Sequence, residues 1–273
     1  MLSIIIPVYN KIEITLSCLQ KNIIHCEHPA EWIIIDNNSD KVTKEGLLQL
    51  KKFAEEKKHK LVIITEKENT GTALAWNTGL NNTNGNYIAI LNNDCVLMPA
   101  WDTAIINEIK NGELDLFTPF IIEPPMLKNQ YHEIDFWEGE KNWEYYLKKN
   151  KGRICKGLFG GVVFMGRKEI FELIGPFDTK FWLTLDDIDY IYHALKKGII
   201  TGTTGNIIGF HHVSATRSGM SIDEQVASDY FTQKWHCDYA KQESSFLNKL
   251  KRSYKKKIFK CFGLLSTVNM KLK

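Results

Sequence analysis

Two amides and a carboxylate stand where a buried strand is predicted to end. Tyr87–Leu91 is a short apolar run, typical of a strand buried on both faces of a parallel sheet. Asn92, Asn93 and Asp94 follow it directly, at the end of the strand where open α/β sheets bind their ligands. A carboxylate there can hold a divalent cation, and the cation can hold phosphates. The alternative is that these residues only cap a helix beginning near Pro99.

Two earlier strands are predicted to end in the same way. Leu2–Val8 is followed by Tyr9, and Glu31–Asp36 ends in a carboxylate. Because the carboxyl ends of parallel strands lie at one edge of a sheet, we expect these side chains to lie close to Asp94. The Asp36 carboxylate can accept the imide N–H of uracil or thymine, which adenine lacks. Its alternative role is to cap the helix that follows.

Two further groups of polar residues lie at predicted helix starts. Asn69 and Gly71 put an amide and a flexible backbone where free N–H groups suit a diphosphate, although the same sequence is a routine N-cap. Asp186, Asp187 and Asp189 bring three acids to another helix start, which is more than a cap needs. One of these carboxylates could therefore take a proton from a reacting hydroxyl as a general base.

The elements that must position these residues alternate between strand and helix. Apolar runs and helical spacing predict strands at 2–8, 31–36, 61–65, 87–91, 114–122, 157–168 and 206–210, and helices at 12–24, 42–58, 69–80, 101–109, 187–197 and 222–239. This order predicts an α/β fold with a mostly parallel central sheet flanked by helices. Residues 123–152 are predicted to be irregular. We expect one domain over residues 1–217 and a C-terminal helical extension over residues 218–273.

Composition and cysteine spacing narrow the class of protein. With 44% hydrophobic and 25% charged residues, the 273-residue chain has the composition of a soluble globular protein. Its net charge of +3 is too small to indicate a nucleic-acid partner, and the basic excess lies in Lys249–Lys260. The six cysteines contain no CxxC pair, so a zinc site is disfavoured. Their scattered spacing fits a reducing, cytoplasmic setting best. We expect neither a signal peptide nor a membrane span of ~20 residues.

A basic stripe near the C-terminus indicates contact with a membrane surface. Leucines, aromatics and an isoleucine share one helical face amid lysines, the pattern of an interfacial helix on an anionic bilayer. These residues are Leu247, Leu250, Tyr254, Ile258 and Phe262. The alternative is a solvated basic helix packed on its own domain. The first interpretation predicts a cytoplasmic protein held peripherally on the inner face of the membrane.

Several short motifs follow one another in a fixed order along the chain. They are Ser3–Asn10, Ile35–Asp40, Asn69–Gly71 with Asn77 and Gly79, Leu91–Asp94, Gly160-Gly161 through Gly175–Asp178, Leu185–Tyr190 and His211–Thr216. Each motif alone is a weak signal, but the ordered set over about residues 2–217 is specific. With this set the chain resembles family 2 glycosyltransferases of the GT-A fold, a Rossmann-like nucleotide-diphospho-sugar transferase fold. Within them it is similar to inverting bacterial enzymes of the rhamnosyltransferase type.

The resemblance implies that the strand ends bind a nucleoside diphosphate sugar. The residues it implies for the nucleotide site are Pro7, Val8, Tyr9, Asp36, Asn69, Gly71, Asn92 and Asn93. The first three would line the base, and Asp36 would accept its imide N–H. Asn92 would hydrogen-bond a ribose hydroxyl.

The resemblance also implies a metal site. Asp94 and His211 would hold Mn²⁺ or Mg²⁺, which neutralises the leaving diphosphate. The family usually has an acid where this chain has Asn92, and this departure would weaken metal binding while leaving the nucleotide interpretation intact. The alternative for His211 is a structural role.

For the reaction, the resemblance implies inverting sugar transfer. An acceptor hydroxyl must lose its proton as it attacks the anomeric carbon, and Asp187 would be the base that takes it. The residues implied to contact the acceptor or the donor sugar are Gly160, Gly161, Asp186 and Asp189. The predicted enzyme moves a hexosyl or deoxyhexosyl group from a UDP- or dTDP-linked sugar to a glycan or lipid-linked glycan. Such an activity belongs to the synthesis of surface polysaccharides or glycoconjugates.

The rival interpretation is a nucleotide-sugar-binding protein without turnover. Asn92 could mark lost metal chemistry, but the three acids at 186, 187 and 189 argue against that loss. An α/β hydrolase is disfavoured because the sequence has no G-x-S-x-G elbow. A dinucleotide enzyme is disfavoured because G-x-G-x-x-G does not follow the first predicted strand.

Overall fold

The computed structural model describes residues 1–123, 142–212 and 224–235 of the chain. Strands and helices alternate as far as β4, and the order is less regular after it. In chain order the elements are β1 (Leu2–Val8), α1 (Ile12–His25), β2 (Glu31–Asp36), α2 (Lys41–Glu56), β3 (Lys60–Thr65), α3 (Gly71–Asn81), β4 (Tyr87–Leu91), β5 (Cys95–Leu97), α4 (Trp101–Asn111), β6 (Leu116–Ile122), α7 (Trp143–Asn150), β7 (Ile154–Lys156), β8 (Val163–Arg167), α8 (Lys168–Ile174), α9 (Asp186–Lys196), β9 (Thr201–His211) and α10 (Glu224–Trp235).

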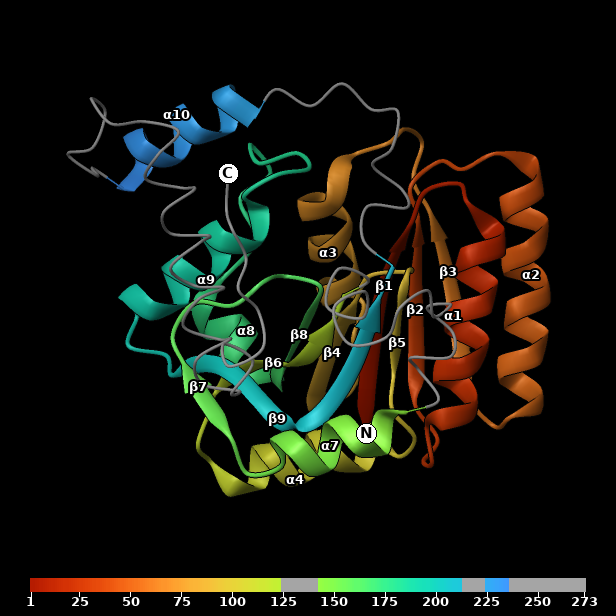
Figure 1. The fold of residues 1–273 in the computed structure, drawn as a ribbon. Helices are drawn as coiled ribbons and strands as arrows, with labels where there is room; N and C mark the ends of the chain where they lie inside the picture. The colour runs from red at the N-terminus through yellow and green to blue at the C-terminus, as the bar shows by residue number, and fades with distance from the viewer. Residues whose placement is uncertain (124–141, 213–223, 236–273) are drawn as a thin grey trace, which may run out of the picture.

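One sheet runs through the middle of the molecule (Figure 1). Its strand order is β3-β2-β1-β4-β8-β6-β9-β5, and β7 pairs with β9. β1 lies parallel to both β2 and β4, and β2 lies parallel to β3. This parallel half brings the carboxyl ends of β1, β2 and β4 to one edge, as expected from the sequence.

The other half of the sheet is mixed. β8 is antiparallel to both of its neighbours, β4 and β6. β9 is antiparallel to β5 and β7 but parallel to β6. None of these four antiparallel pairs joins strands that follow each other in the chain, so their direction is set by contacts between distant segments. The predicted parallel order therefore holds for the first four strands, and the later strands add antiparallel pairs.

Helices cover both faces of this sheet (Figure 1). Along β1, Ile4 and Ile6 pack in a core cluster with residues of α1, α2, α4 and α7. Ile5 packs in a second cluster with residues of α3, α8 and α9. Successive side chains of a strand point to opposite faces, so both faces of β1 are buried. This burial explains why β1 is a continuous apolar run and not an alternating one.

Several elements differ from the sequence-based expectation. β5, α7, β7 and α8 were not predicted, and α7 lies in the segment that was expected to be irregular. The strand expected at 157–168 is only β8, and residues 157–162 before it form a loop. β9 is longer than the expected 206–210 because it pairs along its length with β6 and β7, contacts that no local pattern reveals.

The C-terminal part of the chain is described only over α10. The basic stripe at 247–262 lies outside the described residues, and so do residues 124–141 of the segment that was expected to be irregular. None of the helices in the described ranges has the length and apolar character that crossing a bilayer requires.

Candidate active site

A cavity of about 290 Å³ lies at the carboxyl ends of β1 and β4. Most of the residues that the sequence analysis assigned to a site line its wall. They are Pro7, Val8, Tyr9, Asn69, Asn92, Asn93, Asp94, Gly160, Gly161, Asp186, Asp187 and His211. The wall is formed by the strand ends, the loop before β8 and the start of α9. The structure thus brings the predicted nucleotide, metal and acidic residues around one space, while their roles stay predictions.

Six residues of the cavity wall were missed by sequence reasoning. They are Asn37, Thr72, Trp76, Glu123, Val162 and Leu183. Asn37 directly follows β2, and Glu123 directly follows β6. The same rule that selected Asp94, a polar residue at the end of a strand, could have found both of them.

Asp36 is fully buried at the end of β2 and is not among the residues that line the cavity. Its Oδ1 accepts the backbone N–H of Ser39 at 2.9 Å. Its Oδ2 is buried and has no hydrogen-bond partner among the described residues. The cap of α2 is Asp40, whose Oδ1 accepts the N–H of Thr43 at 2.7 Å. The capping alternative for Asp36 is therefore wrong, and an unsatisfied carboxylate oxygen remains beside the cavity.

The turn before α3 differs from the expected diphosphate site. The N–H of Gly71 donates to Asn69 Oδ1 at 3.1 Å, and the N–H of Thr72 donates to Trp182 O at 3.0 Å. These two N–H groups are therefore already used within the chain, which corrects the expectation that they are free. Gly71 itself has a φ of +79°, and a Cβ there would overlap the Trp182 ring. The glycine is required by this backbone conformation and close packing.

Asn37 holds that turn in place. Its Nδ2 donates to Gly71 O at 3.1 Å, and its Oδ1 accepts the N–H of Thr70 at 3.1 Å and the Thr70 hydroxyl at 2.8 Å. The end of β2 and the start of α3 are thus fixed to each other by one buried amide. Asn69, which directly precedes this turn, lines the cavity wall.

His211, the last residue of β9, lies between two carboxylates. Its Nε2 is 3.3 Å from Asp94 Oδ1, and its Nδ1 is 3.6 Å from Glu123 Oε1. Burial lowers the pKa of an imidazole, but these two carboxylates outweigh it and raise the pKa of His211 to about 9. Burial raises the pKa of Asp94, yet His211 holds it below its ordinary value. Without a bound cation, His211 and Asp94 therefore form an ion pair at neutral pH.

The donor atoms of this group suit Mn²⁺ or Mg²⁺. Carboxylate oxygens are the ligands that hard divalent cations prefer, and Mn²⁺ also accepts imidazole nitrogen. Asp94 and His211 are the residues that would hold the ion, which when bound supplies positive charge beside a leaving diphosphate. The Asn92 side chain lies in the same wall, whereas the Asn93 amide donates to Thr15 Oγ1 of α1 at 2.8 Å. Asn93 therefore ties the site to α1.

Asp187 is held at the cavity wall by the loop before β8. Its Oδ2 accepts the backbone N–H of Gly161 at 2.8 Å, and its Oδ1 accepts the N–H of Ile188 at 2.8 Å. A Cβ built on Gly161 would overlap Asp187 Cβ and lie 2.9 Å from its Cγ. Gly161 is thus the position at which the backbone approaches this carboxylate. Asp186 lines the cavity beside it and is only 2% exposed.

Asp189 is placed differently from the expectation. It is buried outside the cavity wall, where its Oδ2 accepts Lys234 Nζ and its Oδ1 accepts Trp235 Nε1, both at 2.8 Å. Lys234 Nζ also donates to Asp178 Oδ2 at 2.8 Å. Burial raises the pKa of Asp189, and the hydrogen bonds from α10 oppose part of that rise. The expected contact of Asp189 with a sugar is therefore replaced by a bridge from α9 to α10.

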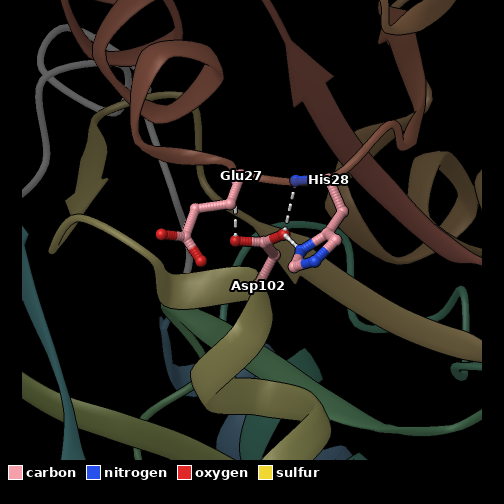
Figure 2. Close-up of side chains that lie close together, drawn as sticks. All are labelled: Glu27, His28 and Asp102. Carbon is pink, nitrogen blue, oxygen red and sulfur yellow. Dashed lines mark hydrogen bonds and ion pairs between the residues drawn. The ribbon is translucent and has the colours of Figure 1, made fainter.

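Figure 2 shows a second group of metal-ligating residue types, Glu27, His28 and Asp102. Glu27 and His28 precede the amino end of β2, and Asp102 lies in the first turn of α4. The Asp102 carboxylate accepts the N–H of Glu27 at 3.0 Å and the N–H of His28 at 2.9 Å, and it faces His28 Nδ1 at 2.8 Å. Since both of its oxygens already hold the loop before β2, we assign this group a structural role.

Replacing Asp102 by alanine should lower the free energy of unfolding by about 2–3 kcal/mol at pH 7, because two backbone N–H groups lose a charged acceptor. Burial raises the pKa of Asp102, but hydrogen bonds from Glu27 and His28 hold it below its ordinary value of 3.8. A lowered folded-state pKa stabilises the protein above the unfolded-state value, and this stabilisation is lost as the pH falls through the folded-state value.

Urea unfolding of Asp102→Ala and the parent between pH 7 and pH 3 measures this difference, which should shrink below about pH 4. Glu27→Ala is the matched control, because its exposed carboxylate holds no backbone N–H of the loop in the described contacts, and it should change stability by less than about 0.5 kcal/mol. Equal losses in the two variants would contradict the assignment.

Comparison with known proteins identifies relatives of this chain. A family model described as Glycosyl transferase family 2 matches residues 3–175. Glycosyltransferase AglE of Haloferax volcanii is 25% identical over 212 residues, which cover 77% of this chain and 66% of that protein. Glycosyltransferase GlyA of Streptococcus pneumoniae is 33% identical over 93 residues, which cover 34% of this chain and 13% of that protein. The chain thus spans just under two thirds of the first relative and a small part of the second.

Solved structures share the fold at low sequence identity. GalNAc-T7 with UDP, GalNAc and Mn²⁺ matches 88% of this chain and 49% of its own, with a TM-score of 0.67 and 15% identity. The Pyrobaculum calidifontis mannosyltransferase PcManGT in complex with GDP-Man and Mn²⁺ matches 79% and 57%, with a TM-score of 0.57 and 21% identity. S. aureus TarS 1-349 in complex with UDP-GlcNAc matches 95% and 72%, with a TM-score of 0.62 and 11% identity. At these identities the likeness shows the fold, which is the GT-A fold expected from the sequence.

Proposed function

This chain belongs to glycosyl transferase family 2, and we propose that it transfers a sugar from a nucleoside diphosphate sugar to a hydroxyl acceptor. The observation that carries the proposal is a single cavity whose wall holds both kinds of group that this reaction needs. Asp94 and His211 can hold a cation beside a leaving diphosphate. Asp186 and Asp187 offer carboxylates to the attacking hydroxyl in the same space.

In the proposed reaction Asp187 is the general base. The acceptor oxygen attacks the anomeric carbon, the bond from that carbon to the diphosphate oxygen breaks, and the hydroxyl proton passes to the Asp187 carboxylate. Attack opposite the leaving diphosphate inverts the anomeric carbon. The N–H of Gly161 orients the carboxylate, because it donates to Oδ2 at 2.8 Å. Gly160, Gly161 and Asp186 would contact the sugars.

We further propose that the donor carries uracil or thymine. Pro7, Val8 and Tyr9 line the cavity at the end of β1, which parallels the end of β2 where Asp36 lies. The buried Oδ2 of Asp36 has no hydrogen-bond partner among the described residues, and an imide N–H would satisfy it. Adenine has no such N–H to offer at that position. The sugar, the acceptor glycan and the linkage are not specified by these contacts.

Changing Asp36 to alanine should weaken the binding of UDP or dTDP by about 1–3 kcal/mol, the cost of losing a charged hydrogen bond. The binding of ADP and GDP should change less, because neither base presents the same imide N–H edge. Titration calorimetry of the four nucleotides in the presence of Mn²⁺ measures the difference. Asp40→Ala is the matched control: it removes the cap of α2 and should not discriminate between bases. Equal weakening of all four nucleotides by Asp36→Ala would count against the assignment.

Donor hydrolysis tests the proposed function itself. Incubation with a panel of UDP- and dTDP-linked sugars and Mn²⁺, without acceptor, should release nucleoside diphosphate slowly, and chelation should stop the release until Mn²⁺ is restored. A protein that binds nucleotide sugars without turnover would be stabilised against heat by the same donor but would release nothing. That result would establish the rival interpretation.

The acceptor is proposed from the family, and the location of the protein is proposed from the sequence pattern of the tail. We propose that the acceptor is a glycan or a lipid-linked glycan, and that residues 246–273 attach the protein peripherally to the cytoplasmic face of an anionic membrane. Lys249–Lys260 holds seven basic residues and no acidic one, and each contributes about 1 kcal/mol near such a surface. Sedimentation with anionic vesicles should therefore depend on the tail and on salt. Binding that is indifferent to both would exclude this attachment.

A further inference from the structure

The imidazole of His211 is held between two acids that come from different strands. Asp94 follows β4, Glu123 follows β6, and His211 ends β9. Nε2 faces Asp94 Oδ1 at 3.3 Å, and Nδ1 faces Glu123 Oε1 at 3.6 Å. The two carboxylates therefore stand at different nitrogens of the same ring. A cation that binds one nitrogen leaves the other nitrogen to the remaining acid.

The ring nitrogen of His211 that faces Glu123 lacks a hydrogen bond within the described residues. His211 is 8% exposed, and its Nδ1 is buried and makes no hydrogen bond in the described part of the chain at this geometry. Glu123 Oε1 lies within ion-pair distance of that atom, about half an ångström beyond hydrogen-bond range. Glu123 is more accessible, with 29% of its side chain exposed, so a small movement of its flexible chain would close the contact.

A neutral histidine carries one proton, and its position decides which nitrogen can bind a metal. If Nδ1–H donates to Glu123, the lone pair lies on Nε2, which is the nitrogen that faces Asp94. Metal-binding histidines commonly donate their second N–H to a carboxylate, which fixes the ring and raises its basicity as a ligand. Glu123 would also add a second negative charge on the far side of the imidazole, in a site to which Asn92 contributes an uncharged amide.

We propose that Glu123 is a positioning residue that orients His211, so that Nε2 of His211 and the Asp94 carboxylate together hold a divalent cation. The inference rests on the cation site of the proposed function and extends it to the residue directly after β6, which no motif of the sequence contains. Glu123 as a direct ligand of the same ion is the competing role. The two roles predict different couplings between Glu123 and His211.

Mn²⁺ affinity tests the proposal without any turnover, by counting free Mn²⁺ with electron paramagnetic resonance as the ion alone is titrated into the full chain. Glu123→Ala should weaken Mn²⁺ binding by about 10–100-fold, the usual effect of removing such a supporting carboxylate. Glu123→Gln should lose less, because its amide oxygen still accepts the Nδ1–H and its shape is unchanged. Glu172→Ala removes an exposed acid of α8 and should leave the affinity unchanged.

A double-mutant cycle separates the two roles. An orienting Glu123 matters only while His211 is present, so Glu123→Ala should have almost no further effect in a His211→Ala background. A direct ligand would cost a similar factor in both backgrounds, and that result would overturn the proposal. The proposal would also be overturned if Glu123→Ala lost less than about 3-fold in Mn²⁺ affinity, or if the parent chain bound no Mn²⁺. A parent that binds Mn²⁺ but never hydrolyses donor would instead contradict the proposed function alone.

Discussion

Asp187→Asn should lose at least ~10²-fold, and up to ~10⁴-fold, in the rate of sugar transfer, because the amide cannot take the acceptor's proton. This corresponds to about 3–5 kcal/mol of barrier. The amide keeps the shape of the side chain, and its oxygen can still accept the N–H of Gly161 that holds Asp187 in place. Donor nucleotide should therefore bind nearly as tightly as in the parent. Transfer rates at saturating donor and acceptor, with nucleotide affinity measured separately, test this expectation.

Glu13→Gln is the matched control for this variant. Glu13 is also an acid in the first turn of a helix, but it is exposed on α1. Its neutralisation changes a helix-terminal charge without touching the cavity, so transfer should be unaffected. If Asp187→Asn keeps more than about a tenth of the parent rate, Asp187 is not the base, and Asp186 becomes the first candidate because it lines the same wall.

Gly161→Ala should lose about 10²-fold or more in transfer rate although Gly161 carries no reacting group. The added Cβ would overlap Asp187 Cβ, so either the loop before β8 or the start of α9 must move. A displacement of about 1 Å in a reacting group can cost ~10²-fold in rate. The same overlap should lower the free energy of unfolding by about 1–3 kcal/mol, as overpacking does. Transfer rates and urea unfolding, measured together, separate the two effects.

Gly152→Ala is the control for the added methyl group. Gly152 has a φ of +77° and nothing within 4 Å of a built Cβ, so it reports backbone strain without a collision. It should reduce stability and leave transfer intact once the protein is folded. A Gly161→Ala variant that transfers sugar at the parent rate would show that Asp187 does not need its present position.

The parallel half of the sheet could be predicted because the residues that determine it lie within each strand or directly after it. β1, β2 and β4 are each a short apolar run, and each is followed within a few residues by a polar one. Burial on both faces of the sheet requires the apolar run, and ligands bind at the edge of the sheet where the polar residues lie. The cavity residues after β1 and β4 were accordingly predicted from the chain alone, whereas Asn37 after β2 was missed.

The other half could not be predicted because its contacts join distant segments. β5 has three residues and is held by β9 on one side, while on the other Asn22 of α1 donates to Cys95 O and accepts the N–H of Leu97, both at 2.8 Å. A segment of three residues is too short for its sequence pattern to predict a strand. The contacts of Asp189 and of the turn before α3 have the same origin. Asp189 accepts from Lys234 and Trp235, and Thr72 donates to Trp182 O, and these partners lie far along the sequence.

The bridge from α9 to α10 bears on where this protein may be cut or recombined. Lys234 joins Asp178 of the loop before α9 to Asp189 within α9, and Phe231 packs with Phe181 and Leu185 of the same loop. A boundary drawn at residue 217, where the recognisable motifs end, would leave the two carboxylates facing each other without their shared cation. Chimeras and truncations should therefore keep residues 176–235 together as one unit, because α10 and the loop it holds have to match.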